Sequence, residues 1–241
     1  MSDIVVRVDA ISKRFEAGKS SVQALNSLSF EIERGEVFAL LGPNGSGKTT
    51  TLNILSCLLD PDQGDVEVLG LKRSDPHFFD KISFMSGDSE YYWAFTVSEI
   101  LKFYANLSRC SWRLTSQLLG EFGLSQLTDR KWMMLSNGEK TRLRLVQALM
   151  TEPEVLFLDE PTVGLDPDIS DIVRTKLKEL HLKGLTIFLT SHYMKDIDSL
   201  ASRVAFIKNG KLLEIAPRED FGDIEQLEQK FIRYAREEER Q

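Results

Sequence analysis

The sequence has few of the residues that cross-link small proteins or bind metal ions. Its 241 residues include two cysteines, Cys57 and Cys110, and three histidines scattered along the chain. Two cysteines cannot build a disulfide framework, and neither residue type shows the close spacing of a metal site. We therefore expect both cysteines to be small, buried hydrophobic side chains in a reducing compartment.

Long apolar runs and an excess of basic residues are also lacking. No window approaches the ~20 apolar residues that a membrane-spanning helix needs. The N-terminus has early acidic residues and an alternating pattern, which is not that of a signal peptide. The formal net charge of −7 argues weakly against binding to a nucleic-acid backbone. A function at a membrane would require another chain to supply the spans.

The residues that are present are those of an ordinary globular protein, with 42% hydrophobic and 28% charged residues. Strands are predicted at Ile4–Ile11, Leu28–Ile32, Val37–Leu41, Val66–Leu69, Ile82–Met85, Val155–Asp159, Thr186–Thr190, Arg203–Lys208 and Lys211–Ile215. Helices are predicted at Lys48–Leu59, Val97–Asn106, Arg113–Phe122, Gly138–Met150, Ile169–Leu180 and Glu225–Glu239.

This order of elements predicts an α/β fold. The runs VFALL, VLFLD and TIFLT are apolar throughout, which is typical of central parallel strands covered by helices on both faces. The early strands alternate and indicate an antiparallel edge layer. Only helices are predicted in about 88–150, which we interpret as a helical insertion into a domain spanning residues 1–218. Residues 219–241 predict a charged C-terminal helix that packs on the body of the protein.

The stretch GPNGSGKTT has the pattern of a phosphate-binding P-loop, since it follows an apolar strand and opens a helix. Its candidate nucleotide-binding residues are Gly42, Pro43, Asn44, Gly45, Ser46, Gly47, Lys48, Thr49 and Thr50. The glycines let backbone N–H groups turn toward a phosphate, and the helix N-terminus adds a favourable dipole. Lys48 is expected to reach the β- and γ-phosphates and Thr49 to bind Mg²⁺. The sequence thus predicts a P-loop nucleoside triphosphatase with a mostly parallel sheet.

Two acidic residues follow the strand VLFLD, at the end of a strand where α/β sheets place their chemistry. Asp159 is suited to bind Mg²⁺ through water, and Glu160 to accept a proton from an attacking water. An Asp-Glu pair that only caps a helix is the alternative. His192 follows another apolar strand and is predicted to hydrogen-bond the γ-phosphate, unless it is an ordinary loop residue.

The stretch LSNGEKTRLRLVQALM, before the Asp-Glu strand, resembles the signature motif of ATP-binding-cassette (ABC) ATPases. The resemblance extends from Phe15 to about Pro217. It implies that two cassettes face each other and that Ser136, Asn137 and Gly138 contact the γ-phosphate of the ATP bound by the partner cassette. It also implies that Phe15 stacks on adenine, with a core phenylalanine as the alternative. Asp166, in TVGLDP, would cross the dimer interface, and His192 would be the switch histidine.

Two features depart from the family pattern. The signature reads Leu-Ser-Asn-Gly-Glu where Leu-Ser-Gly-Gly-Gln is commonest, and little loss is expected because Asn137 tolerates a left-handed backbone. The other departure lies in a loop. Where the family has a loop glutamine near Mg²⁺ and the attacking water, this chain has Gly87. The aromatic residues Tyr91, Tyr92 and Trp93 follow in the same loop. The resemblance implies that this 87–95 loop receives a helix of a membrane subunit, and aromatic side chains suit such an interface. The alternative is that they pack the helical insertion onto the sheet; in either case we expect at least one ring to point inward.

The resemblance implies an ATP-hydrolysing subunit of a transporter, with ATP and Mg²⁺ bound, located peripherally at the cytoplasmic face of a membrane. The short cassette is more typical of exporters than of importers. A second cassette, identical or different, and an integral membrane subunit are the expected partners, and no nucleic acid is expected. The alternatives are a soluble, non-transport cassette acting on ribosomes or DNA, and a catalytically inactive regulatory cassette; Glu160 argues against the latter.

We expect hydrolysis to survive the loss of the glutamine but to be slower or less tightly coupled. The Gly87→Gln variant should therefore show faster Mg²⁺-dependent phosphate release, or stronger stimulation by the membrane partner, than the natural chain. The measurement is steady-state ATPase activity with and without that partner. Equal activity and equal stimulation in the two proteins would show that the missing amide is inconsequential.

Overall fold

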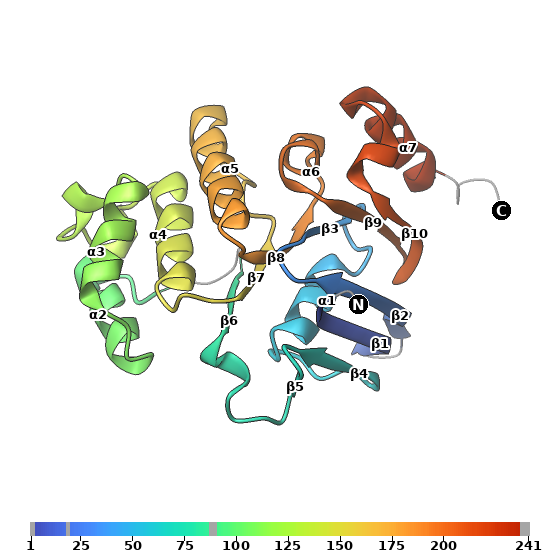
Figure 1. Cartoon of the computed structure of the whole chain (residues 1–241), viewed down its shortest axis with the longest axis horizontal. Coiled ribbons are helices and arrows are strands. Elements are labelled where there is room, and N and C mark those ends of the chain that lie inside the picture. Colours follow the sequence, from blue (N-terminus) through green and yellow to red (C-terminus); the bar gives the residue numbers. More distant parts are fainter. Residues whose placement is uncertain (1–2, 18–19, 87–90, 237–241) are drawn as a thin grey trace.

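The computed structural model describes residues 3–17, 20–86 and 91–236 of the chain, and its main feature is a sheet of six strands in the order β10-β9-β3-β8-β7-β6 (Figure 1). The strands are β3 (Val37–Leu41), β6 (Ile82–Met85), β7 (Val155–Asp159), β8 (Thr186–Ser191), β9 (Arg203–Lys208) and β10 (Lys211–Pro217). All neighbours are parallel except β9 and β10, which form an antiparallel hairpin. Asn209 and Gly210 turn this hairpin with φ angles of +48° and +71°, as their sequence predicts.

A second sheet is antiparallel and has the order β2-β1-β4-β5. Its strands are β1 (Ile4–Ala17), β2 (Ser20–Glu33), β4 (Gln63–Val68) and β5 (Leu71–Lys72). The 14-residue strands β1 and β2 are longer than predicted. Their pairing shifts register at several points, and Ala10 and Ser27 have positive φ angles, so the alternation of apolar and polar residues is interrupted. The predicted antiparallel layer is present, as a sheet of its own.

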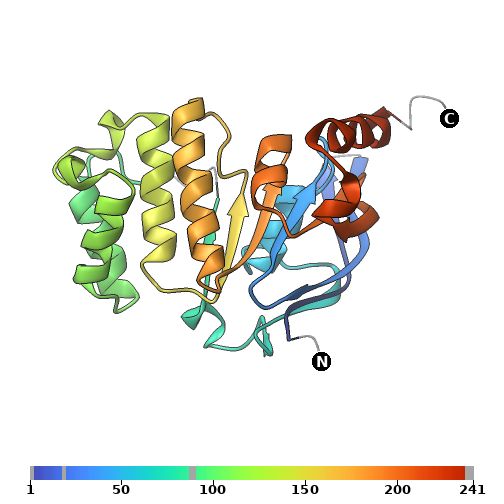
Figure 2. The same ribbon diagram turned by 45° about the horizontal axis from the view of Figure 1, so that its top comes forward.

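The described part of the chain contains seven helices. They are α1 (Lys48–Leu55), α2 (Val97–Leu107), α3 (Trp112–Glu121), α4 (Asn137–Leu149), α5 (Pro167–Leu182), α6 (Met194–Leu200) and α7 (Ile224–Arg236). Figures 1 and 2 show α4, α5 and α6 side by side along one face of the six-stranded sheet, with α1 on the other side near the antiparallel sheet. The predicted α/β class, with a mostly parallel core, is confirmed.

Two hydrophobic cores correspond to these layers. The core around α1 joins both sheets, and the rings of Phe30, Phe38 and Phe188 stack within it, with Phe30 and Phe38 centroids 5.0 Å apart. The other core lies under α4 to α6 and extends into α2 and α3. Apolar side chains point to both faces of the central strands, which explains why their sequences do not alternate.

The segment between β6 and β7 contains α2, α3 and α4 and short 3₁₀ turns, with one isolated bridge between Thr96 and Lys131 among the described residues. Helix α1 is shorter than predicted, because Ser56 ends it and Cys57 has a φ angle of +57°. Helix α6 was not predicted, since seven residues are too few for a clear periodic pattern. None of the helices in the described ranges has the length and apolar character needed to cross a bilayer.

Helix α7 packs on the body of the protein. Leu227 is fully buried, and Glu214 of β10 accepts hydrogen bonds from Tyr234 Oη at 2.6 Å and Lys230 Nζ at 2.7 Å. Lys208 Nζ donates to the carbonyl of Tyr234 at 2.9 Å, near the end of the helix. These contacts anchor the charged helix to the β9–β10 hairpin.

A buried carboxylate at the start of α6 joins four parts of the fold. Asp196 is fully buried and accepts hydrogen bonds from Thr162 Oγ1 at 2.5 Å and Ser191 Oγ at 3.1 Å. Arg174 Nη1 of α5 lies 2.7 Å from its other oxygen. Asp196 thus links the loop after β7, the end of β8 and helix α5. A buried charge with this many partners is stable because each oxygen is paired.

We predict that Asp196→Ala lowers the free energy of unfolding by about 3 kcal/mol, because it leaves the buried Arg174 without its inner partner. Arg174 keeps Asp171 as a partner, which limits the loss. Asp198→Ala on the same helix removes the partly exposed pair with Arg218 and should cost less than ~1 kcal/mol. Urea denaturation of both variants measures the difference. Equal losses would contradict the role assigned to Asp196.

Candidate nucleotide-binding site

The P-loop connects the end of β3 to the start of α1, in the strand–loop–helix order that the sequence predicts. Gly47 caps α1 with a φ angle of +109°, and a Cβ there would lie 2.7 Å from the carbonyl oxygen of Ala24. A Cβ on Gly42 would lie 2.3 Å from the carbonyl oxygen of Ile207. Both positions therefore require glycine. Pro43, Asn44, Gly45 and Ser46 complete the turn, and Thr50 follows in the first turn of α1.

The ammonium group of Lys48 lies at the mouth of this loop. Its Nζ donates to the carbonyls of Gly42 at 2.8 Å and Pro43 at 3.2 Å, and it lies 3.5 Å from Glu160 Oε1. The side chain is only 5% exposed. A buried cation beside a helix N-terminus is well suited to bind the phosphates of a nucleotide.

Strands β7 and β8 place Asp159 next to Thr190, since the two residues are paired in the parallel register. Thr190 Oγ1 donates to Asp159 Oδ1 at 2.5 Å, and Thr49 Oγ1 lies 3.4 Å from the same oxygen. Burial raises the pKa of the Asp159 carboxyl, and the hydroxyl donors Thr190 and Thr49 act in the opposite direction. A carboxylate beside a hydroxyl is the kind of oxygen donor set that Mg²⁺ prefers.

Glu160 has a backbone conformation that is uncommon outside glycine, with a φ angle of +47°. Its N–H donates to both the carbonyl and the hydroxyl of Thr190, at 3.1 Å each, which stabilises this conformation. Left-handed backbone at a residue other than glycine costs about 1–3 kcal/mol and is concentrated at functional sites. The carboxylate lies between two basic groups, with Oε2 3.0 Å from His192 Nδ1 and Oε1 near Lys48. The contact with His192 is close but is not an aligned hydrogen bond.

Thr49, Asp159 and Glu160 border a cavity of about 360 Å³, which we call the catalytic cavity. It is lined by Thr49, Met85, Thr141, Arg144, Asp159, Glu160 and Val163. The sequence predicted Thr49, Asp159 and Glu160, and missed Thr190 beside them. Thr190 could have been found, because neighbouring parallel strands end at the same edge of a sheet. Arg144 could not, because its place depends on how α4 packs against β6.

No described group of three or more histidine, cysteine, aspartate or glutamate residues could hold a metal ion. This fits Mg²⁺, which is bound in nucleotide sites by one or two protein oxygens, by phosphates and by water. Thr49 and Asp159 supply such oxygens here.

The predicted signature residues lie at the N-terminus of α4, apart from the P-loop. Ser136 and Glu139 form a capping box, in which Glu139 N–H donates to Ser136 Oγ at 3.2 Å and Ser136 N–H donates to Glu139 Oε2 at 2.8 Å. The S-x-x-E pattern could have been recognised in the sequence. Asn137 and Gly138 open the helix, and Asp166 stands at the N-cap of α5. Within the described ranges no hydrogen bond or ion pair joins these residues to the P-loop.

The aromatic predictions have different outcomes. Phe15 on β1 is 41% exposed, with Lys13 Nζ 5.8 Å from its ring centre, so the alternative of a core phenylalanine is wrong. Tyr91 points inward against Trp132, with ring centres 4.8 Å apart, which confirms the expectation of one inward ring. Tyr92 and Trp93 are exposed.

Gly87, the position at which the family has a loop glutamine, lies outside the described residues.

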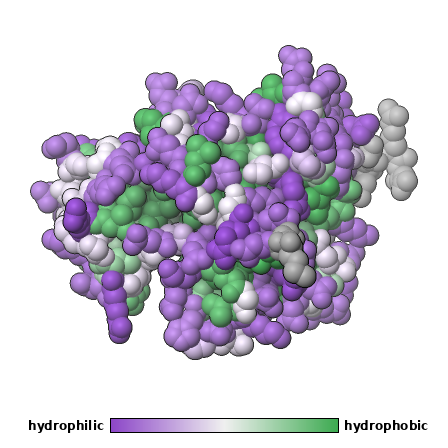
Figure 3. Space-filling view, in the orientation of Figure 1, coloured by the Kyte–Doolittle hydropathy of each residue, from purple (hydrophilic) through white to green (hydrophobic). Residues whose placement is uncertain are grey.

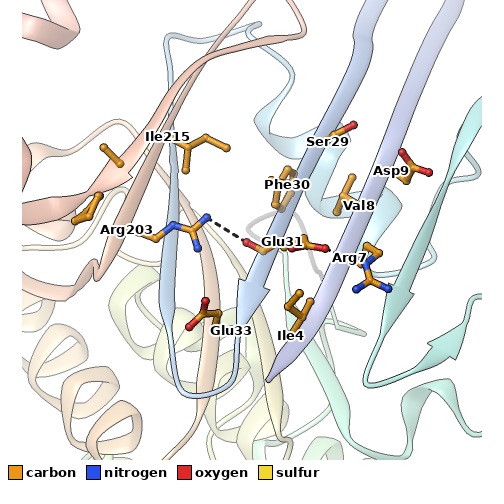
Figure 4. A pocket seen from close by; sticks show the side chains of 12 residues that line it. Ile4, Arg7, Val8, Asp9, Ser29, Phe30, Glu31, Glu33, Arg203 and Ile215 are labelled. Atoms are coloured by element: carbon orange, nitrogen blue, oxygen red, sulfur yellow. Dashed lines mark hydrogen bonds and ion pairs between the residues drawn. The ribbon is translucent and has the colours of Figure 1, made fainter. Parts of the chain in front are cut away.

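A further hollow of about 610 Å³ lies between the antiparallel sheet and the β9–β10 hairpin (Figure 4). Within it Arg7 Nε lies 3.0 Å from Glu31 Oε1, and Arg203 donates to the backbone carbonyl of Glu31 at 3.2 Å. None of the candidate site residues lines it. The chemistry predicted from the sequence is therefore concentrated at the ends of β3, β7 and β8.

Comparison with known proteins shows the family to which the chain belongs. The family model described as "ABC transporter" matches residues 25–163. The chain is 31% identical over 222 residues to the linearmycin resistance ATP-binding protein LnrL of Bacillus subtilis, covering 90% of this chain and 70% of that protein. It is 34% identical over 213 residues to a fluoroquinolones export ATP-binding protein of Mycobacterium tuberculosis, covering 88% and 70%. It is 35% identical over 225 residues to the Nod factor export ATP-binding protein I of Burkholderia pseudomallei, covering 90% and 73%.

Solved structures show the same fold. The dimeric cassette MJ0796 bound to ADP and Pi superposes with a TM-score of 0.82 at 24% identity, covering 89% of this chain and 99% of that one. An ATP-binding subunit of an ABC transporter gives a TM-score of 0.82 at 24% identity, covering 95% and 99%. The family model and the relatives agree with the geometry of the P-loop and its carboxylates: the chain belongs to the ABC transporter family, as an ATP-binding ATPase.

Proposed function

We propose that this chain hydrolyses ATP at the ends of β3, β7 and β8 and thereby drives export through a separate membrane subunit. The observation that carries the proposal is the place of Glu160, which follows Asp159 in the chain and has one carboxylate oxygen 3.5 Å from Lys48 Nζ and the other 3.0 Å from His192 Nδ1. The names of the relatives, which include drug and Nod factor export, favour export as the direction of transport.

In this proposal the P-loop holds the phosphates, and Lys48 moves from the loop carbonyls onto the β- and γ-phosphates. Thr49 and Asp159 would hold Mg²⁺, and the ion would supply positive charge beside the phosphate oxygens. Phe15, exposed on β1, stacks on the adenine ring. Glu160 accepts the proton of the attacking water, and the nearby His192 hydrogen-bonds the γ-phosphate.

The signature residues act on a second cassette. Ser136, Asn137 and Gly138 form the capped N-terminus of the 13-residue helix α4, which is a favourable site for an anion. Their ligand in this proposal is the γ-phosphate bound by a partner cassette, which is the role that the family resemblance implies for these positions. Asp166, at the exposed start of α5, lies in the same interface.

An exposed apolar surface favours a membrane subunit as the other partner. It is made by Tyr92, Trp93, Phe95, Phe103, Met133 and Met134. Its two loop segments lie side by side, since Met133 N–H donates to the Trp93 carbonyl at 3.3 Å and Trp132 N–H donates to the Phe95 carbonyl at 2.8 Å. Figure 3 shows one face of the molecule, which is mostly hydrophilic with several separate apolar areas, one of them over the helices on the left of Figure 1. Aromatic and methionine side chains are enriched in protein interfaces, and such a partner would place the chain at the cytoplasmic face of a membrane.

We predict that Glu160→Gln lowers Mg²⁺-dependent phosphate release by about 10²–10⁴-fold, because the amide cannot accept the proton of water. ATP affinity should be largely retained, since Lys48 and the P-loop are unchanged. Phosphate release and binding of a fluorescent ATP analogue measure the two effects, with the membrane partner reconstituted. Equal rates for Glu160→Gln and the natural chain would contradict the assigned mechanism.

We further expect that affinity purification of the tagged chain from gently solubilised native membranes recovers an integral membrane protein. Trp93→Ser should reduce that recovery, because it removes an exposed aromatic side chain from the proposed interface. Val22→Ser is a matched control, since Val22 is equally exposed but lies on the antiparallel sheet. Recovery of ribosomal or DNA-repair proteins without a membrane chain would contradict the transport function.

A further inference from the structure

The catalytic cavity has a wall in common with a second cavity, which we call the outer groove. The groove has a volume of about 430 Å³. Its described lining residues are Phe79, Ile82, Ser83, Phe84, Met85, Tyr91, Tyr104, Leu107, Ser108, Arg144, Gln147 and Thr151. Among the described residues, Met85 and Arg144 line both cavities. Met85 ends β6 and Arg144 lies in the middle of α4, so the wall is formed where that helix crosses that strand.

Arg144 differs from an ordinary surface arginine. It is only 9% exposed, and its guanidinium lies 5.3 Å from the ring centre of the buried Trp132. A guanidinium keeps its charge at any pH a protein tolerates, and it stacks well on aromatic faces. The catalytic cavity that it lines also contains the carboxylates of Asp159 and Glu160. One permanent positive charge therefore borders the site of phosphate chemistry.

On the side of the outer groove, the same side chain belongs to an aromatic cluster. Trp132 packs edge to face against Tyr91 with ring centres 4.8 Å apart, and Tyr91 packs against Tyr104 at 5.8 Å. Tyr91 Oη donates to Gln147 Oε1 at 3.2 Å, one turn beyond Arg144 on α4. A change in the position of the guanidinium would alter the packing of Trp132 and Tyr91. These two rings support the exposed segment that begins with Tyr92.

We propose that Arg144 is a positioning residue that couples nucleotide occupancy of the catalytic cavity to the shape of the outer groove. A bound triphosphate adds several negative charges to a cavity that Arg144 already borders, and the attraction draws the guanidinium toward it. Trp132 and Tyr91 follow because they pack against it. The inference rests on the proposed ATP site, and it assigns the coupling to the chain's own α4 helix.

Hydrogen exchange of the purified full chain tests the coupling. The probe is the non-hydrolysable analogue AMP-PNP with Mg²⁺, and the readout is exchange of the backbone amides in 91–95 and 104–108, which border the groove. In the natural chain we expect AMP-PNP to slow the hydrogen exchange of these amides. This effect of AMP-PNP should be lost in Arg144→Met and partly lost in Arg144→Lys. Thr151→Val is the control, since Thr151 lines the outer groove but not the catalytic cavity, and its hydroxyl donates to the Ala148 carbonyl rather than to the aromatic cluster. It should retain the slowing.

AMP-PNP affinity is measured in parallel. It distinguishes a failure of the proposed ATP site from a failure of the coupling role of Arg144. Failure of the natural chain to bind AMP-PNP would contradict the proposed ATP site itself. Normal binding by Arg144→Met with undiminished slowing would overturn the coupling role of Arg144. Loss of binding in a folded Arg144→Met chain would also overturn it, because Arg144 would then be a direct ligand contact. Should Arg144→Met not fold, Arg144→Lys decides, and undiminished slowing in it overturns the proposal.

Discussion

The buried ammonium of Lys48 lies against two loop carbonyls and the Glu160 carboxylate, and the rest of the fold serves to hold this arrangement of charges. Taking charged groups out of water is costly unless each has a close partner. Parallel strands satisfy this condition, because their carboxyl ends meet at one edge of the sheet. The register of β7 with β8 sets Asp159 beside Thr190, and Thr190 in turn holds the strained backbone of Glu160.

The need of every buried charge for a close partner also explains the polar groups behind the site. Asp196 ties the loop that follows Glu160 to the end of β8, directly before His192, and Arg174 balances its charge. These contacts hold the backbone on both sides of Glu160 and His192 in place, and well-positioned groups supply most of the catalysis in enzymes that transfer phosphoryl groups. The capped start of α4 is built in the same way, yet it makes no described contact with the P-loop of its own chain.

Local motifs made most of the site predictable. The P-loop, the Asp-Glu pair and the signature helix are each continuous in sequence, and flanking apolar runs indicated their strands and helices. Features that depend on packing at a distance were not predictable. The burial of Asp196 and Arg144 arises from how α6 and α4 lie against other elements, and the bulges of β1 and β2 hid their length.

The most direct test of this account is a structure of the Glu160→Gln chain with ATP and Mg²⁺. We predict two cassettes arranged head to tail, with Lys48 on the phosphates of one nucleotide and Ser136 to Gly138 of the partner cassette against the same γ-phosphate. Thr49 and Asp159 should lie at the metal ion. A nucleotide bound away from the P-loop, or a pair of chains in which the start of α4 faces solvent with ATP in place, would contradict it.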